Sequence, residues 1–152
     1  MAAPAIVPAA PEDAGAILAL QRLAFAREAA LYEDQSIAPL VETEADILRR
    51  MGVGCLLAAK LDGALVGAVH GSMDGPECHV AWLMVHPDMQ GRGLGAELML
   101  AIEAHFTKAA AYCLFTGHRS AGNLKLYTRL GYREVRREPV NDRLTFVHMR
   151  KP

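Results

Sequence analysis

The chain has 152 residues, and its charges almost cancel, since 16 lysines and arginines face 17 aspartates and glutamates. A chain of this length can bury a hydrophobic core without disulfides or metals, and we predict one domain over residues 1–152. The sequence contains no block of like charge and therefore has no electrostatic footprint for nucleic acid or for an anionic membrane.

The N-terminal stretch MAAPAIVPAAPEDAG is apolar, but prolines interrupt it and it has no basic segment. No stretch reaches the roughly 18 apolar residues that a membrane span needs. The 3 cysteines lie inside apolar runs and share no C-x-x-C spacing, which indicates buried free thiols of a reducing compartment. We therefore expect a cytoplasmic protein with no membrane segment, no nucleic-acid partner and no metal site.

Strand and helix patterns fill the first half of the chain. A short strand candidate, AIVPA, precedes a helix that opens with PED and continues to residue 32. After an irregular segment, EDQSIAPLVE, Thr43 and Asp46 resemble a capping box for a second helix over EADILRRM. Two apolar strands then surround Asp62-Gly63, a strong hairpin signal, and CHVAWLMV is a fourth strand.

The second half continues with a helix over residues 94–106, in which apolar residues recur at helical spacing, and with a fifth strand, AYCLFTG. Ser120 is expected to cap a fourth helix, AGNLKLYTRL, which ends at Gly131, a residue suited to the left-handed position after a helix. YREVRRE and LTFVHMRK supply the last two strands. The prediction is an α/β domain of about seven strands and about four helices.

Glycines gather where the third helix begins, in the segment HPDMQGRGLG. A helix start carries unpaired N–H groups and the positive end of the helix dipole, so Gly91, Gly93 and Gly95 would let a phosphate approach the main chain. Gly91-x-Gly93-x-x-Ala96 also fits the dinucleotide fingerprint, which normally lies in the first strand-turn-helix unit. Here several elements precede it, and no acidic residue for a ribose follows between Glu103 and Glu134, so a dinucleotide site is disfavoured.

Two motifs together support a different interpretation. Gln90-x-x-Gly93-x-Gly95 resembles the R/Q-x-x-G-x-G/A motif of the GNAT superfamily of acyl-coenzyme A dependent N-acyltransferases. NLKLYTRLGYREV is similar to a second segment of that family, with Asn123 and Tyr127 in register. The resemblance covers nearly the whole chain. It implies a mixed, mostly antiparallel sheet whose fourth and fifth strands splay apart.

The resemblance also implies a coenzyme site. In this family, successive N–H groups of the glycine loop hold the pyrophosphate, and unpaired main-chain groups of the fourth strand hold the pantetheine arm and polarise the acetyl carbonyl. The residues of this chain that match are Leu83, Met84, Val85, Gln90, Gly91, Arg92, Gly93, Leu94, Gly95, Ala96, Asn123 and Tyr127. The implied cofactor is acetyl-coenzyme A.

For catalysis, the resemblance implies that Tyr127 protonates the departing thiolate. A primary ammonium has a pKa near 10, so a base or a water chain must take its proton. Many family members carry a glutamate early in the fourth strand, whereas this chain has His79, which leaves the base open. His79, His118 and Glu28 are the candidates.

Acidic residues around a tyrosine mark the segment that borders the acceptor end of the cleft in the family. Glu28, Tyr32, Glu33 and Asp34 would suit a cationic amine such as a polyamine or an amino sugar, although such a group can equally be a solvated helix end. The expected function is acetyl transfer to an amine of a small molecule or peptide by direct attack. The alternative is a domain of the same fold that binds acyl-coenzyme A without turnover, and homodimers are frequent in the family.

Overall fold

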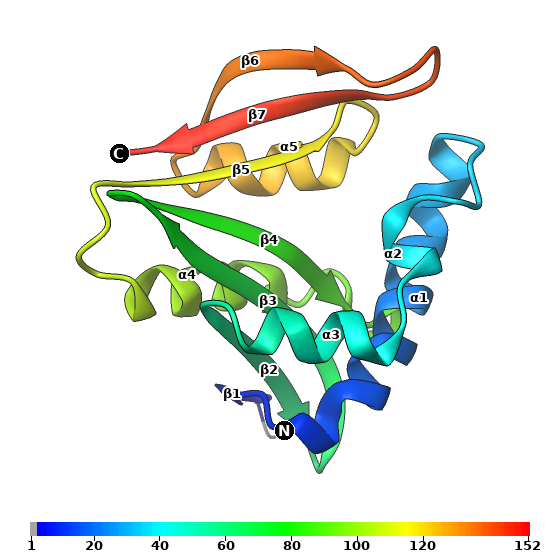
Figure 1. Cartoon of the computed structure of the whole chain (residues 1–152), viewed down its shortest axis with the longest axis vertical. Coiled ribbons are helices and arrows are strands. Elements are labelled where there is room, and N and C mark those ends of the chain that lie inside the picture. The colour runs from blue at the N-terminus through cyan, green and yellow to red at the C-terminus, as the bar shows by residue number, and fades with distance from the viewer. Residues whose placement is uncertain (1–2) are drawn as a thin grey trace.

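A computed structural model describes residues 3–152, and in this part of the chain seven strands form one sheet in the order β1-β2-β3-β4-β5-β7-β6. Neighbouring strands are antiparallel except β4 and β5 (Figure 1). The strands are β1 Ala5–Pro8, β2 Cys55–Leu61, β3 Ala64–Asp74, β4 Glu77–Val85, β5 Ala111–Gly117, β6 Arg133–Pro139 and β7 Thr145–Lys151. The helices are α1 Ala14–Leu31, α2 Ala38–Val41, α3 Glu44–Met51, α4 Leu94–His105 and α5 Ala121–Arg129. The mixed, mostly antiparallel sheet is as predicted.

Local sequence signals fix most element boundaries. The Asp46 carboxylate accepts a hydrogen bond from the Thr43 N–H at 2.7 Å, which confirms the predicted start of α3. Asp62 and Gly63 have φ angles of 52° and 83°, so the β2–β3 hairpin turns where predicted. Gly131 follows α5 with a φ angle of 104°, in the left-handed region.

Two local expectations were wrong. Residues 38–41, expected to be irregular, form the single helical turn α2. Ser120 occupies the N-cap position of α5, but its side chain does not cap the helix. Its hydroxyl instead donates a hydrogen bond to Glu28 on α1, because that carboxylate lies within reach only in the folded chain.

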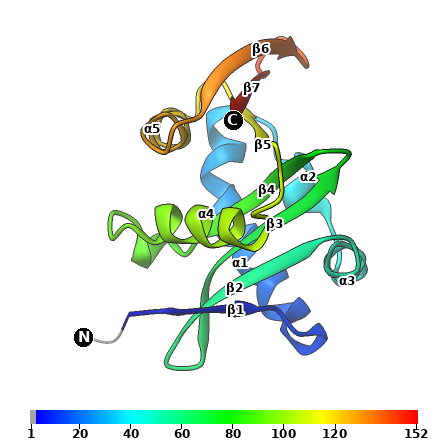
Figure 2. The same ribbon diagram turned by 90° about the vertical axis from the view of Figure 1, so that its left-hand side faces the viewer.

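Helices cover both faces of the sheet (Figure 2). On one face, α4 and α5 pack on a core that includes Leu98, Ile102 and Tyr127. On the other face, α1 and α3 enclose a second core that includes Ile17 and Ile47. None of the helices within residues 3–152 combines the length and hydrophobicity that a membrane crossing requires. The cysteines are free thiols; Cys55 and Cys78 are buried and Cys113 is half-buried.

The strands β4 and β5 pair over a short distance only. Their contact runs from Glu77–Ala111 to His79–Cys113, after which β5 pairs with β7 alone. Figure 1 shows β4 and β5 meeting at one end and parting toward α1 and α2. The main chain of β4 beyond His79 therefore has a partner on one side only.

A bulge in β4 accompanies this divergence. The register between β3 and β4 shifts between Ala68 and His70, and Trp82 lies opposite this shift with a φ angle of 58°. A left-handed backbone conformation is energetically unfavourable for a bulky residue. Such a conformation is kept only where the surrounding contacts stabilise it. The bulge bends β4 away from β5 and turns the Trp82 side chain toward α1.

A buried polar cluster ties α1 and α3 to the bulged strand. The Arg50 guanidinium lies 3.7 Å from the centroid of the Trp82 ring and donates hydrogen bonds to Gln21 and Glu42. His70 Nε2 donates to the carbonyl of Arg50 at 3.0 Å and to that of Val53. Arg50 is thus paired with a carboxylate, and His70 is tied to the end of α3.

Burial of His70 makes the stability of the fold pH-dependent. Desolvation lowers the pKa of this imidazole, so in the folded chain it stays neutral to a lower pH than in the unfolded chain. Between the lowered value and about 6.5, only the unfolded chain binds this proton, and the free energy of unfolding falls as pH decreases.

We therefore expect the melting temperature to fall between pH 7.5 and pH 5.5, and to fall less in His70→Gln, whose amide can still donate to both carbonyls. The measurement is thermal unfolding followed by circular dichroism across this range. His105→Gln, at an exposed histidine of α4, is the control and should behave as wild type. An unchanged pH dependence in His70→Gln would contradict the assignment.

Candidate functional site

Two cavities lie where β4 and β5 part. The glycine-loop pocket, about 680 Å³, is bounded by α1, the end of β4, the loop before α4 and the start of α5. The aromatic pocket, about 620 Å³, is bounded by α1, α2, β4, β5 and the β6–β7 turn. Both are lined by Phe25, Glu28, Leu83 and Asn123. The two cavities therefore meet at the opening in the sheet.

The glycine-loop pocket offers donors to an anion. Gly91 and Gly93 have φ angles of 75° and 82°, and a side chain at either position would meet nothing within 4 Å. Within residues 3–152, the N–H groups of residues 91–96 have no hydrogen-bond partner, and α4 begins at Leu94 with its positive dipole end at this loop. The arrangement is an open cradle of main-chain donors at a helix start.

Cationic side chains add positive charge to the glycine-loop pocket. Arg27, Lys125 and Arg129 also line the pocket, whereas Arg92 lies outside the lining. The other predicted loop residues Gln90, Gly91, Gly93, Leu94, Gly95 and Ala96 all line it. The Gln90 side chain donates to the Val85 carbonyl at 3.2 Å, which fixes the loop to the end of β4. The pocket thus combines backbone donors, a helix dipole and three cationic side chains.

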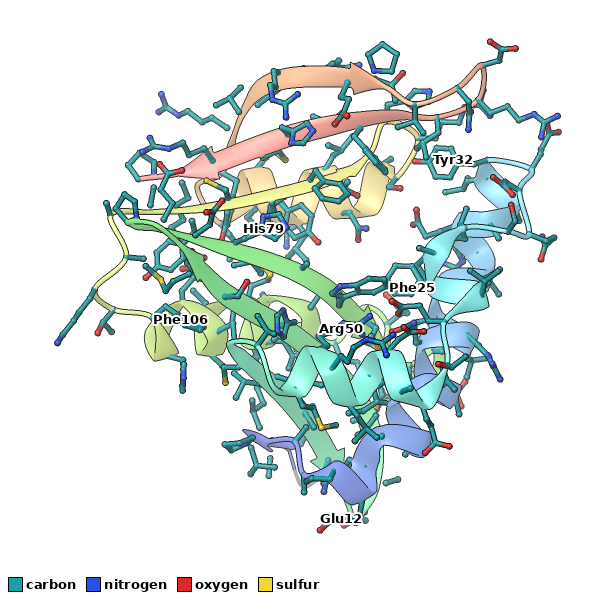
Figure 3. The ribbon with its side chains drawn as sticks, in the orientation of Figure 1. Glu12, Phe25, Tyr32, Arg50, His79 and Phe106 are labelled. Atoms are coloured by element: carbon teal, nitrogen blue, oxygen red, sulfur yellow. The ribbon has the colours of Figure 1, made fainter. Side chains whose placement is uncertain are left out.

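Two pairs of aromatic side chains line the aromatic pocket. Phe25 and Trp82 meet edge to face with ring centroids 6.3 Å apart, and Phe115 and Phe146 lie 4.5 Å apart. The first pair comes from α1 and β4 and the second from β5 and β7, on opposite sides of the opening. Figure 3 shows Phe25 and His79 at the edges of this space.

Tyr127 reaches the opening from α5. Its side chain is buried and lines the aromatic pocket, and within residues 3–152 no hydrogen bond engages its hydroxyl. Burial, together with the nearby charge of Glu28, raises the pKa of Tyr127 well above its usual range. The hydroxyl is therefore protonated at physiological pH and is available as a donor.

Glu28 ends a chain of hydrogen bonds that joins α1 to the start of α5. The Arg119 N–H donates to the Tyr32 hydroxyl at 3.0 Å, and Tyr32 lies 2.9 Å from the Ser120 hydroxyl. Ser120 donates to Glu28 Oε2 at 2.5 Å. Since Tyr32 accepts from a backbone donor, its own proton points to Ser120, and the chain holds the Glu28 carboxylate at the opening.

The other predicted residues divide between the pockets and the surface. Leu83 to Val85 line the glycine-loop pocket, while His79, Tyr32 and Asp34 line the aromatic pocket. Desolvation lowers the pKa of His79, so its imidazole is neutral at physiological pH. His118 and Glu33 line neither pocket: His118 Nδ1 accepts from the Thr145 N–H at 2.9 Å, and the Glu33 side chain is 76% exposed beside Arg143.

Several lining residues were not anticipated from the sequence. Among them, Phe25 lies three positions before Glu28, which the sequence had already indicated, so both side chains lie on one face of α1. Lys125 and Arg129 lie four apart on α5 in the same way. Helical spacing could have grouped each set. By contrast, nothing in the sequence marks Trp82, Phe115 and Phe146 as neighbours.

Comparisons with known proteins identify the family of this chain. The family description "Acetyltransferase (GNAT) domain" matches residues 29–152. An uncharacterized N-acetyltransferase of Methanocaldococcus jannaschii is 30% identical over 83 residues, or 53% of this chain and 53% of that protein. The match therefore spans about half the length of that relative.

Solved structures share the fold. The ribosomal-protein-S18-alanine N-acetyltransferase from Escherichia coli matches with a TM-score of 0.81 at 20% identity, over 98% of this chain and 93% of that one. The PaiA N-acetyltransferase from Thermoplasma acidophilum, in complex with coenzyme A, matches with a TM-score of 0.79 at 15% identity over 99% of each chain. Because the family description covers most of the sequence, the chain belongs to the GNAT acetyltransferase family.

Proposed function

We propose that the chain transfers an acetyl group from acetyl-coenzyme A to a primary amine that attacks directly in a ternary complex. The observation that carries this proposal is the meeting of two pockets at the opening between β4 and β5, with Glu28 and Leu83 lining both. One pocket would hold the acetyl donor and the other the amine. A free amine could then reach the donor without a covalent enzyme intermediate.

The glycine-loop pocket fits the coenzyme. Its main-chain donors at residues 91–96 suit a pyrophosphate, and Arg27, Lys125 and Arg129 add positive charge for further phosphate. The PaiA enzyme with coenzyme A supports the same assignment by its fold. The coenzyme supplies the acetyl group as a thioester. A main-chain N–H of residues 83–85, on the side of β4 that lacks a strand partner, would donate to the carbonyl oxygen.

Glu28 is our candidate for the group that takes the first proton. An amine with a pKa near 10 is neutral in only about one molecule in a thousand at pH 7, so the ammonium must lose a proton near the thioester. Glu28 lines both pockets, whereas His79 lines the aromatic pocket alone. His118 lines neither pocket and its Nδ1 is engaged. From Glu28 the proton passes to solvent.

Tyr127 is our candidate for the acid. The attacking nitrogen bonds to the carbonyl carbon and the carbon–sulfur bond breaks. Tyr127 gives its proton to the sulfur and recovers one from the nitrogen, so that one proton is released overall. Transfer from a phenol whose pKa is raised by burial is uphill, and much of the effect must come from hydrogen bonding to the sulfur as charge develops.

We also assign this activity to the cytoplasm, because the free thiols Cys55, Cys78 and Cys113 suit a reducing compartment. Burial raises the pKa of Cys78 to about 11, so this thiol is protonated and unreactive.

Gly93→Asp should weaken acetyl-coenzyme A binding by about tenfold or more, because a carboxylate would enter the donor cradle and oppose the phosphate charge. Calorimetric titration measures the affinity. Gly63→Asp is the matched control, since it adds the same carboxylate at a positive φ angle in the remote β2–β3 turn. Unchanged affinity in folded Gly93→Asp would refute the loop as the phosphate site.

Tyr127→Phe should lower kcat by about 10²-fold and leave coenzyme affinity nearly unchanged, because only the hydroxyl is lost. The readout is release of free thiol from acetyl-coenzyme A in the presence of an amine panel. Tyr112→Phe removes a hydroxyl that bonds to main-chain carbonyls outside both pockets and serves as control. Coenzyme binding without turnover by wild type on any amine would favour the non-catalytic alternative.

Glu28→Gln should lower kcat/KM by about 10²-fold at pH 7, and the deficit should shrink as pH rises toward the pKa of the amine, because the substrate then loses its proton unaided. A pH profile of both enzymes measures this. His79→Gln is the comparison variant. If the loss of kcat/KM that shrinks at alkaline pH appears in His79→Gln and not in Glu28→Gln, the base is His79.

A further inference from the structure

The walls of the aromatic pocket are mostly carbon. Apart from the two aromatic pairs, Ile37, Pro39, Leu114, Val140 and Leu144 contribute to the lining. The rings approach from four separate elements, α1, β4, β5 and β7, so that an occupant would have ring faces or edges on opposite sides. A site of this kind holds a flat apolar body by contact area and ring stacking.

The charged groups of the pocket favour an ammonium at one end. Its carboxylates are Glu28, at the opening, and Asp34, whose pKa is lowered by hydrogen bonds from Ser36. The cationic side chain in the lining is Arg50, which is committed to Glu42 and stacked on Trp82. The lining histidines, His70 and His79, are both neutral because desolvation lowers the pKa of each.

We propose, building on the acetyltransferase function above, that the acceptor is a primary amine on an aromatic skeleton, with its nitrogen at Glu28 and its ring between the Phe25–Trp82 and Phe115–Phe146 pairs. This assignment follows from the placement of carboxylate and rings in one cavity, with Glu28 also lining the opposite pocket. It differs from the polyamine or amino sugar that the acidic segment alone would suggest.

The apolar walls of the pocket favour an aromatic amine over a polyamine or an amino sugar. A polyamine would place a flexible methylene chain between the rings, and its second ammonium would have to reach Asp34, whose carboxylate already accepts hydrogen bonds from Ser36. An amino sugar would place several hydroxyls against walls that are mostly carbon. An anionic aromatic compound would meet Glu28 and Asp34 with no uncommitted cation in the described lining. An aromatic amine satisfies both ends of the pocket.

The fluorescence of Trp82 is a direct probe of this pocket, because the chain has a single tryptophan and its side chain lines the cavity. Titration of the protein alone with phenethylamine should shift or quench its fluorescence in a saturable way. Putrescine, glucosamine and phenylpropionate, which lack the ring or the ammonium, should bind about tenfold more weakly or not at all. A stronger response to putrescine, glucosamine or an alanine-initiated peptide would overturn the assignment.

A pair of variants tests the rings themselves. Phe115→Ala should weaken phenethylamine binding by about tenfold, because it removes one member of an aromatic pair from a partly exposed position where the fold tolerates it. Leu100→Ala truncates an apolar side chain that is similarly exposed, on α4 and outside both pockets, and should bind as wild type. Equal affinity in Phe115→Ala and wild type would overturn the placement of the ring.

Failure of this inference can be told apart from failure of the acetyltransferase function. Calorimetry with acetyl-coenzyme A tests the donor site without any amine, and Trp82 fluorescence tests the acceptor site without any coenzyme. Donor binding with no aromatic preference in fluorescence refutes the acceptor class and leaves the function standing. Absence of donor binding refutes the function itself, whatever Trp82 reports.

Discussion

The site depends on the incomplete pairing of β4 with β5. These strands share backbone hydrogen bonds only near Glu77–His79, and a parallel pair that continued through the sheet would close the opening. β5 stays paired with β7 in antiparallel fashion as far as Gly117. The divergence therefore leaves β4 without a partner on one side, while β5 keeps its place in the sheet. The polar main chain of β4 is then left for a ligand, since buried backbone groups require a partner.

The bulge at Trp82 and the cluster around Arg50 keep this opening in shape. A bulky side chain in the left-handed region is strained, and the stacked guanidinium of Arg50 and the edge of Phe25 hold it in place. Arg50 is itself buried and is satisfied by Glu42 and Gln21. Truncation of any member of this group would leave a buried charge or a strained strand without support.

Helix α1 connects the two pockets. One of its faces presents Phe25 to the rings and Glu28 to the opening. Tyr32, which follows the last residue of the helix, belongs to the hydrogen-bond chain that ends at Glu28. The pockets that it joins differ in chemistry, since one gathers main-chain donors and cations and the other gathers carbon and carboxylates. Such a division would suit the proposed reaction between a polyanionic donor and an ammonium, each attracted to its own pocket.

The sequence by itself determined those features that depend on neighbouring residues. Asp62-Gly63 predicted the hairpin, Thr43 with Asp46 predicted the start of α3, and the glycines before Leu94 predicted an open helix start, because turns and caps are set by residues a few positions apart. The two spaced motifs also identified the family and, with it, the sheet with its splayed strands.

Tertiary structure decided the features that join distant residues. Ser120 was expected to cap α5, but it bonds to Glu28, which lies 92 positions away along the chain. Phe25, Trp82, Phe115 and Phe146 meet only because four elements converge on the opening, and His118 turns to Thr145 and away from both pockets. Local patterns fix which elements form, whereas the chemistry of a pocket depends on side chains that only packing brings together.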